Sequence, residues 1–378
     1  MLKRIALSLV AVMASSAGFG QTPPPTGPET LLPLSVLRNI INEVSGELAF
    51  QNEVLLGGVY RNRPPQEYAS THFEVDFILK KLREYSLENS EIIDLPARED
   101  KTWDAESAEL WMTKPALAKI ADYREVPASL CSGSAATDTT AELVYVGPGN
   151  REEFYQGKDV KGKIVLVNGA PEMARRLAVE KFGALGLVGY ASSHPEHDPD
   201  QVGWSSIRVS EKEKPTFAFM ISTRLGRELR DSLERGEAIE VRAFCRTQEV
   251  PYKEQMVAAL LPGAEFPEEE LVFTAHLFEG TSMRGANDND SGCASILETA
   301  RSLKKLIADG KIAPLRRSVR FLFVPEIGGT AAYVQTYPQI SQRFFAAINE
   351  DMVGEALALN KSFFNLERTP HSLPSCLN

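Results

Sequence analysis

Apolar residues recur at intervals of three to four positions in two segments near the start of the chain. Residues 31–44 (LLPLSVLRNIINEV) and residues 72–87 (HFEVDFILKKLREYSL) both show this spacing, which is typical of amphipathic helices that pack through one face. A short strand is expected next, at residues 90–96 (SEIIDLP). A loop-rich connection that contains Trp103 and Trp111 is expected to follow it.

From about residue 135 to residue 248 the pattern changes to short apolar runs separated by glycines. The runs AELVYVG, GKIVLVNG and GALGLVGY indicate strands, and EMARRLAVEKF indicates a helix. A strand, a helix and a strand then follow between Thr216 and Phe244. The glycine spacing in GALGLVG superficially matches a phosphate-binding loop, but it follows a helix and enters a strand, so we expect no nucleotide cofactor here. The segment predicts a small α+β domain.

After residue 250, strands and helices alternate. The order is a strand (EELVFTAH), a helix (SGCASILETARSLKKLI), a strand (SVRFLFVPE), a helix (GTAAYVQTY) and a strand (FFAAINEDMVG). This βαβαβ order predicts a parallel sheet with helices on its faces, and hence an α/β fold.

The composition is that of a globular protein with an acidic balance. The chain has 378 residues, 43% of them hydrophobic and 24% charged, and the 41 Lys and Arg against 51 Asp and Glu give a net charge of −10. This length is enough for two or three domains. Because basic runs are short, we expect no nucleic-acid partner.

The N-terminus (MLKRIALSLVAVMASSAGFGQ) has a basic start, an apolar stretch and a small-residue end, the pattern of a cleaved secretory signal. Residues 1–20 are expected to be the signal peptide and residues 21–30 a disordered leader. The apolar stretch is shorter than the roughly 20 residues that span a bilayer. We therefore expect a secreted or periplasmic protein with no membrane span in its mature form.

The four cysteines, Cys131, Cys245, Cys293 and Cys376, show no CxxC spacing, so a structural zinc knuckle is not expected. Export permits disulfides, and a Cys131–Cys245 bridge is left open. Cys293 lies on the apolar face of a predicted helix and is expected to be a buried thiol.

A loop with the sequence SSHPEHDPDQ gathers possible metal ligands at residues 192–201. They are His194, His197, Asp198 and Asp200. The prolines mark an exposed turn without groups to orient such ligands. A solvated loop is the preferred interpretation.

The candidate chemistry lies where the last three strands end. His276 follows one strand, Glu326 the next, and Glu350 and Asp351 the third, while the loop GANDNDSG carries Asp288. In an open α/β sheet, ligands bind outside the carboxyl ends of the strands. Imidazole and carboxylate groups gathered there are the donor set of a catalytic zinc site.

These blocks resemble a known family. TAHLFEG, GANDNDSGCASILETAR, RFLFVPE and AINEDMVGE are similar to segments of the co-catalytic zinc exopeptidases, which include bacterial leucyl aminopeptidases, glutamate carboxypeptidase II and the transferrin receptor. The segment DVKGKIVLVNGAPEMARRLAVEKFGALGLVGY resembles the protease-associated domain that many members carry as an insertion. The resemblance implies an α/β/α sandwich with a mixed, largely parallel sheet, of the phosphorylase/hydrolase-like type, plus this small inserted domain.

The resemblance also implies a division of the chain. After the signal and leader, residues 31–130 would form the N-terminal helical part of the peptidase domain, residues 131–249 the protease-associated domain, and residues 250–378 a metallopeptidase core that is incomplete at its C-terminus. His371 is the one histidine available downstream as a last ligand.

The resemblance implies a two-zinc site that hydrolyses peptides with a metal-activated water. Asp288 matches the carboxylate that bridges both ions, His276 and Asp351 match ligands of one ion, and Glu326 matches a ligand of the other. One zinc ion or none is also possible here, because this chain departs from the family pattern.

Two departures concern catalysis. The family has HLD where this chain has His276-Leu277-Phe278, and Glu-Glu where it has Pro325-Glu326. The general base is therefore expected to be Glu326 or Glu279, or to be lost, since proline cannot accept a proton.

Three functions stay open. The first is an exported zinc-dependent peptidase, most specifically an aminopeptidase. The second is a non-catalytic, receptor-like binding protein of the same fold, or a truncated inactive fragment. The third is single-zinc acyl transfer of the glutaminyl cyclase kind.

Overall fold

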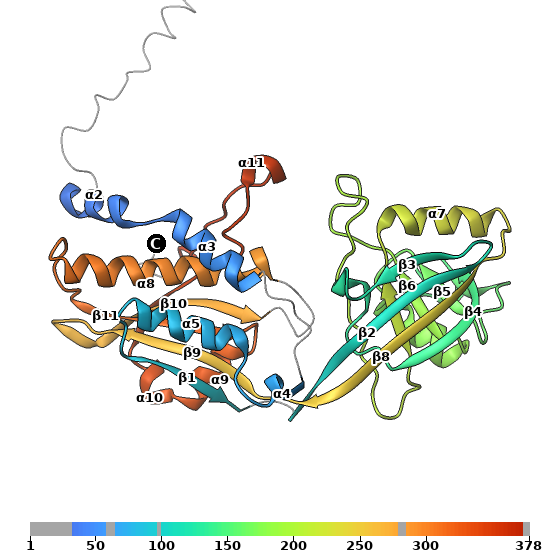
Figure 1. Cartoon of the computed structure of the whole chain (residues 1–378), viewed down its shortest axis with the longest axis horizontal. Coiled ribbons are helices and arrows are strands. Elements are labelled where there is room, and N and C mark those ends of the chain that lie inside the picture. The colour runs from blue at the N-terminus through green and yellow to red at the C-terminus, as the bar shows by residue number, and fades with distance from the viewer. Residues whose placement is uncertain (1–31, 58–64, 97–99, 279–284, 373–378) are drawn as a thin grey trace, which may run out of the picture.

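The computed structural model describes residues 32–57, 65–96, 100–278 and 285–372. It contains two units, each built on its own sheet, and a long two-stranded ribbon of β2 and β8 joins them (Figure 1). The expected signal peptide and leader, as well as Glu279 and Cys376, lie outside the described residues.

The first unit has a five-stranded sheet in the order β1-β9-β11-β10-β12. The strands are β1 (Ser90–Leu95), β9 (Glu254–Leu261), β10 (Phe266–Phe278), β11 (Arg317–Pro325) and β12 (Phe344–Asn349). β10 runs parallel to β11 and β12, whereas β9 is antiparallel to β1 and β11. The sheet is therefore mixed, and its parallel part is the one that the βαβαβ order predicts.

Helices cover both faces of this sheet. On one face lie α2 (Leu34–Glu43), α3 (Gly46–Gly57), α5 (Phe73–Glu84) and α8 (Gly292–Ala308), and on the other lie α9 (Gly329–Thr336) and α10 (Pro338–Ser341) (Figure 1). Successive side chains of β9 serve the two faces in turn: Val257 packs with α5 and α8, and Ala258 packs with Tyr333 of α9. The α/β fold class is confirmed.

The second unit has a seven-stranded sheet in the order β3-β2-β8-β4-β5-β6-β7. The strands are β2 (Lys101–Lys114), β3 (Ala118–Asp122), β4 (Thr137–Tyr145), β5 (Ile164–Val167), β6 (Gly186–Gly189), β7 (Phe217–Met220) and β8 (Glu240–Pro251). Its helices are α6 (Pro171–Arg175), which continues as η3 (Arg176–Lys181), and α7 (Thr223–Glu234). The α6–η3 helix and α7 pack into separate apolar clusters.

The remaining elements are short. They are α4 (Pro65–Tyr68), η1 (Pro127–Ser129), η2 (Glu152–Tyr155), η4 (Ala286–Ser291) and α11 (Leu357–Asn360). Among the described residues, no helix is both long enough and apolar enough to cross a bilayer.

The structure corrects the prediction of a loop through Trp103 and Trp111. Both residues lie in β2, which pairs with β8 from Lys101 to Lys114. Its sequence lacks a clean apolar alternation, and the long ladder with β8, which contains two register shifts, defines the strand instead. The boundary expected at residue 131 therefore falls inside the second unit.

The Cys131–Cys245 bridge that the sequence left open is not formed. Both thiols are free and buried, and they lie in apolar clusters on opposite faces of the second sheet. Burial raises the pKa of each thiol to about 12, so both stay protonated at neutral pH. Cys293 is buried in α8, as expected.

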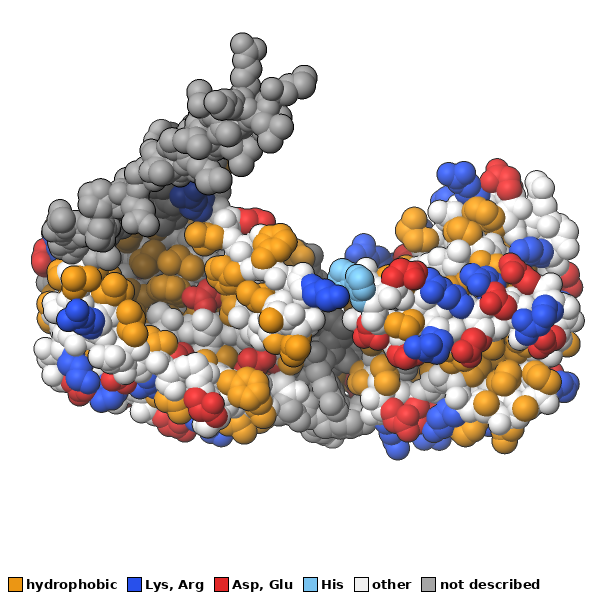
Figure 2. Space-filling view, turned by 90° about the horizontal axis from the view of Figure 1, so that it is seen from above, with side chains coloured by type: hydrophobic (Ala, Val, Ile, Leu, Met, Phe, Trp, Pro, Cys, Tyr) orange, Lys and Arg blue, Asp and Glu red, His pale blue; other side chains and the backbone are white. Residues whose placement is uncertain are grey.

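One face of the first unit is notably apolar. Figure 2 shows hydrophobic side chains gathered on the side that carries α2 and α3. Ile41 is 64% exposed and Phe50 is 58% exposed, and α2 has no buried residue. The two helices therefore bury only part of their apolar side chains against α8.

A polar network nevertheless ties the α2–α3 corner to α8. The Arg301 guanidinium donates to Glu298 of its own helix and to Glu43 of α2 (2.8 Å each). Glu298 is buried and also accepts the backbone N–H of Ser45 (2.7 Å). The network fixes where the chain passes from α2 to α3.

This network predicts an acid-dependent loss of stability. The hydrogen bond from Arg301 lowers the pKa of Glu43 below its usual 4.5. A lowered folded-state pKa stabilises the protein above the unfolded-state pKa, and this stabilisation is lost as pH falls through the folded-state value. In unfolding curves between pH 6 and pH 3, we expect Glu43→Gln to lower the midpoint at pH 6, with the deficit shrinking towards pH 3. A constant deficit would contradict this prediction, and Glu47→Gln on the exposed side of α3 is the control.

Candidate metal centre

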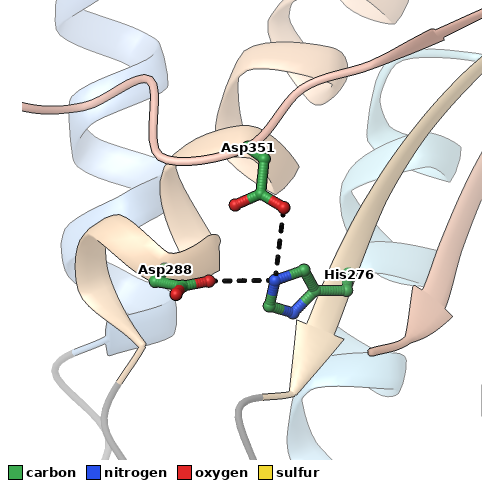
Figure 3. Close-up of side chains that lie close together, drawn as sticks. All are labelled: His276, Asp288 and Asp351. Carbon is green, nitrogen blue, oxygen red and sulfur yellow. Dashed lines mark ion pairs between the residues drawn. The ribbon is translucent and has the colours of Figure 1, made fainter. Parts of the chain in front are cut away.

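Two parallel strands and one loop converge at the carboxyl edge of the first sheet. His276 lies near the end of β10, opposite Val324 of β11, and Asp351 follows the end of β12. Asp288 lies in η4, the kinked turn that leads into α8. Figure 3 shows the three side chains pointing toward one another.

The distances within this group suit a small cation. The Nε2 atom of His276 lies 2.9 Å from Oδ1 of Asp288 and 3.6 Å from Oδ2 of Asp351. The three ligand atoms all lie within 4.8 Å of one another, and no other group of three potential metal ligands occurs in the described ranges. Two ligands of a tetrahedral zinc ion, at about 2.0 to 2.1 Å from it, are roughly 3.3 Å apart. The donors therefore fit zinc in both type and spacing.

The group is buried on its histidine side and open on its carboxylate side. The His276 side chain is 9% exposed, whereas those of Asp288 and Asp351 are 42% and 41% exposed. Burial and the nearby Asp288 charge raise the pKa of Asp351, and His276 opposes the shift. A cation at this position would offset the repulsion between the carboxylates.

Close backbone approach shapes the turn around Asp288. A Cβ atom on Gly285 would lie 2.2 Å from the carbonyl oxygen of Asp288, and one on Gly292 would lie 2.2 Å from that of Glu350. Neither position tolerates a side chain without movement of the backbone. Gly285 thus lets η4 turn tightly on itself, and Gly292 lets the start of α8 pack directly against Glu350 after β12.

Of the four residues expected to bind metal, the structure brings three together. Glu326 follows β11 at the same edge of the sheet, but it is exposed and lies outside the group. Its roles as metal ligand and base therefore stay predictions, as does the role of Glu279. His371 is exposed and also lies outside the group.

The histidine loop of the second unit holds no metal group within the described residues. Instead, ion pairs tie it to α7, Asp200 with Arg224 and Glu196 with Arg227, both at 2.7 Å. These ion pairs hold the loop against α7, and its interpretation as a solvated loop stays a prediction.

A family model matches the C-terminal part of the first unit. The model described as Peptidase family M28 matches residues 255–372, which include all three clustered side chains. These residues form a peptidase family M28 domain. M28 is the co-catalytic zinc exopeptidase family, so the resemblance of the C-terminal blocks to that family is confirmed.

Solved structures agree with the M28 fold. An aminopeptidase from Aneurinibacillus sp. strain AM-1 is 21% identical, with a TM-score of 0.54 over 84% of this chain and 73% of that one. A peptidase M28 precursor from Shewanella amazonensis SB2B is 17% identical, with a TM-score of 0.64 over the same shares. BSAP, a zinc aminopeptidase from Bacillus subtilis, is 19% identical, with a TM-score of 0.55 over 82% and 69%. No curated protein matches the chain significantly.

Proposed function

We propose that this protein is an exported zinc-dependent peptidase, most specifically an aminopeptidase. The observation that carries the proposal is the convergence of His276, Asp288 and Asp351 at the carboxyl edge of the M28 sheet. The aminopeptidase activity is proposed because two structural neighbours are aminopeptidases. Export rests on the N-terminal sequence, and the second unit is proposed to be a protease-associated domain.

The residues present can each be given a chemical task. His276 offers the lone pair of Nε2, and Asp288 and Asp351 supply negative charge from two different segments. Zinc bound there would polarise the scissile carbonyl and lower the pKa of a bound water towards neutrality. Glu326 or Glu279 would take up the proton of the attacking water and return it to the leaving amine.

The number of zinc ions is part of the proposal. Two ions are expected from the family, with Asp288 between them, whereas the clustered group by itself provides the donors for one. The position of Glu326 outside this group favours the second candidate, a non-catalytic binding protein with the same fold.

Metal analysis separates the candidates without a known substrate. We expect the dialysed full chain to hold one or two zinc ions, measured by elemental analysis, and to hydrolyse aminoacyl chromogenic substrates until a chelator is added. Zinc at 100 times its Kd should also stabilise the fold by about 2.7 kcal/mol, because it binds the folded state alone.

Two outcomes would count against the proposal. A chain without zinc, whose unfolding curve is indifferent to chelator, would favour the non-catalytic binding protein. A chain that retains one zinc ion but converts N-terminal glutamine rather than cleaving peptides would favour acyl transfer.

A further inference from the structure

A single buried amide holds the backbone on both sides of Asp351. The Nδ2 group of Asn289 donates to the carbonyl oxygen of Glu350 (2.9 Å), and its Oδ1 accepts the N–H of Met352 (3.3 Å). The same Oδ1 accepts the N–H of Gly292 at the start of α8 (3.0 Å). Asn289 is 2% exposed, so water cannot easily replace these bonds.

These bonds matter because they are made by the two residues that flank Asp351 in the segment after β12. Asp351 and Met352 are both exposed, and Met352 has a φ of +52°. That left-handed conformation is uncommon for a residue with a side chain, and it persists where surrounding contacts impose it. The Asn289 amide supplies such a contact directly.

Asn289 is also the neighbour of Asp288 in the chain. Asn289 therefore contacts both candidate ligands. It follows Asp288 in the chain, and its side chain hydrogen-bonds the backbone on either side of Asp351. The spacing between the Asp288 and Asp351 carboxylates is thus set through Asn289. Because the task needs both a donor and an acceptor in one short side chain, asparagine suits it and alanine does not.

Two neighbouring residues make comparable bonds without flanking Asp351. Ser291 accepts the N–H of Val353 (3.0 Å), and Asn287 accepts the N–H of Gly354 (3.2 Å) and donates to Glu355 (3.1 Å). Every second residue of η4 from 287 to 291 thus accepts a backbone N–H from one of the three consecutive residues 352–354. Asn287 provides a matched control, since it offers the same side chain in the same pair of segments.

We propose that Asn289 is a positioning residue that fixes Asp351 relative to Asp288 for zinc binding. The proposal rests on the zinc site of the proposed function. Residues that orient metal ligands from behind typically change metal affinity by about 10- to 100-fold when they are replaced.

The test compares Asn289→Ala with Asn287→Ala in the full chain. Zinc alone is titrated against a chromophoric chelator, and thermal unfolding is followed separately in excess chelator. We expect Asn289→Ala to weaken zinc binding by about 10- to 100-fold, and Asn287→Ala to weaken it far less even where the two variants unfold at similar temperatures. Equal zinc affinities for the two variants would overturn the proposal.

A double-mutant cycle tests whether Asn289 acts through Asp351. In an Asp351→Asn background, Asn289→Ala should cause no further loss of zinc affinity, and a full additive loss would overturn the proposal.

If Asn289→Ala fails to fold, Asn289→Asp replaces it, because this variant keeps the acceptor oxygen and loses the donor to Glu350. Weaker zinc binding by Asn289→Asp supports the proposal, and wild-type affinity overturns it. A wild-type chain that binds no zinc overturns the proposed function together with this inference, whereas zinc bound equally by wild type and Asn289→Ala overturns the inference alone.

Discussion

Asp288→Asn is expected to abolish zinc binding. The substitution keeps the size of the side chain and removes the negative charge that lies 2.9 Å from Nε2 of His276. A direct ligand should matter more than groups that only orient ligands, so we expect the affinity to fall by more than about 100-fold. Elemental analysis after dialysis measures the metal content, and peptide hydrolysis should be lost in parallel.

The control for this variant is Glu355→Gln, which removes a carboxylate nearby. Glu355 accepts a hydrogen bond from Asn287 and lies outside the clustered group. It should leave the zinc content unchanged. Unchanged zinc content in Asp288→Asn would refute the assignment of Asp288 as a ligand.

The second large effect is expected on stability, from Glu270→Ala. Glu270 lies on β10 at the end away from His276, and its side chain is fully buried. It pairs with Arg320 of β11 and with Arg343 just before β12, the latter at 3.0 Å. Removing one partner of a buried ion pair leaves uncompensated charge in the interior, which typically costs about 3 to 5 kcal/mol. Denaturant unfolding measures this loss.

The adjacent residue provides the matched control. Glu269 pairs with Arg317, and these two side chains are 41% and 42% exposed. Exposed pairs contribute about 1 kcal/mol or less, so Glu269→Ala should be nearly neutral. Similar losses for the two variants would show that burial of Glu270 does not control the effect.

The regular spacing of apolar residues was enough to predict much of the first unit. The helices α5 and α8 and the strands β10, β11 and β12 all overlap the segments that the sequence pattern indicates. α5, α8 and β10 each bury apolar residues, and β11 is buried on both faces from Ser318 to Pro325. β12 is the exception: its sequence is apolar, but Ala346 is its one buried residue, and Phe345 and Ile348 are 47% and 38% exposed. Local sequence and burial therefore agree except at β12.

Elements defined by long-range pairing were harder to predict. β2 carries polar residues along its length and is a strand because β8 lies beside it. β9 lies between β1 and β11 and is antiparallel to both, whereas the βαβαβ order indicates only the parallel part of the sheet. Neither position follows from the local pattern of residues.

The candidate metal site was likewise predictable in part. The rule that ligands gather at strand ends predicts the meeting of His276, Asp288 and Asp351, and the structure brings their ligand atoms together. The contacts of Asn289 could not be predicted, because they depend on how closely η4 approaches the segment after β12. The alternation of Asn287, Asn289 and Ser291 in the sequence was the available signal.

The β2–β8 ribbon has a consequence for how the chain is assembled. The second unit is entered and left through paired strands, since Lys101 lies opposite Pro251 and the N–H of Tyr252 donates to the carbonyl of Asp100 (2.9 Å). The second unit is therefore an insertion between two strands of the five-stranded sheet, β1 and β9, and the two ends of the insertion lie side by side. The entropy of closing a loop grows only with the logarithm of its length. A short turn from Asp100 to Tyr252 could replace the second unit and preserve every strand pair of the first sheet. The second unit could therefore be gained, lost or exchanged in evolution as a single inserted domain.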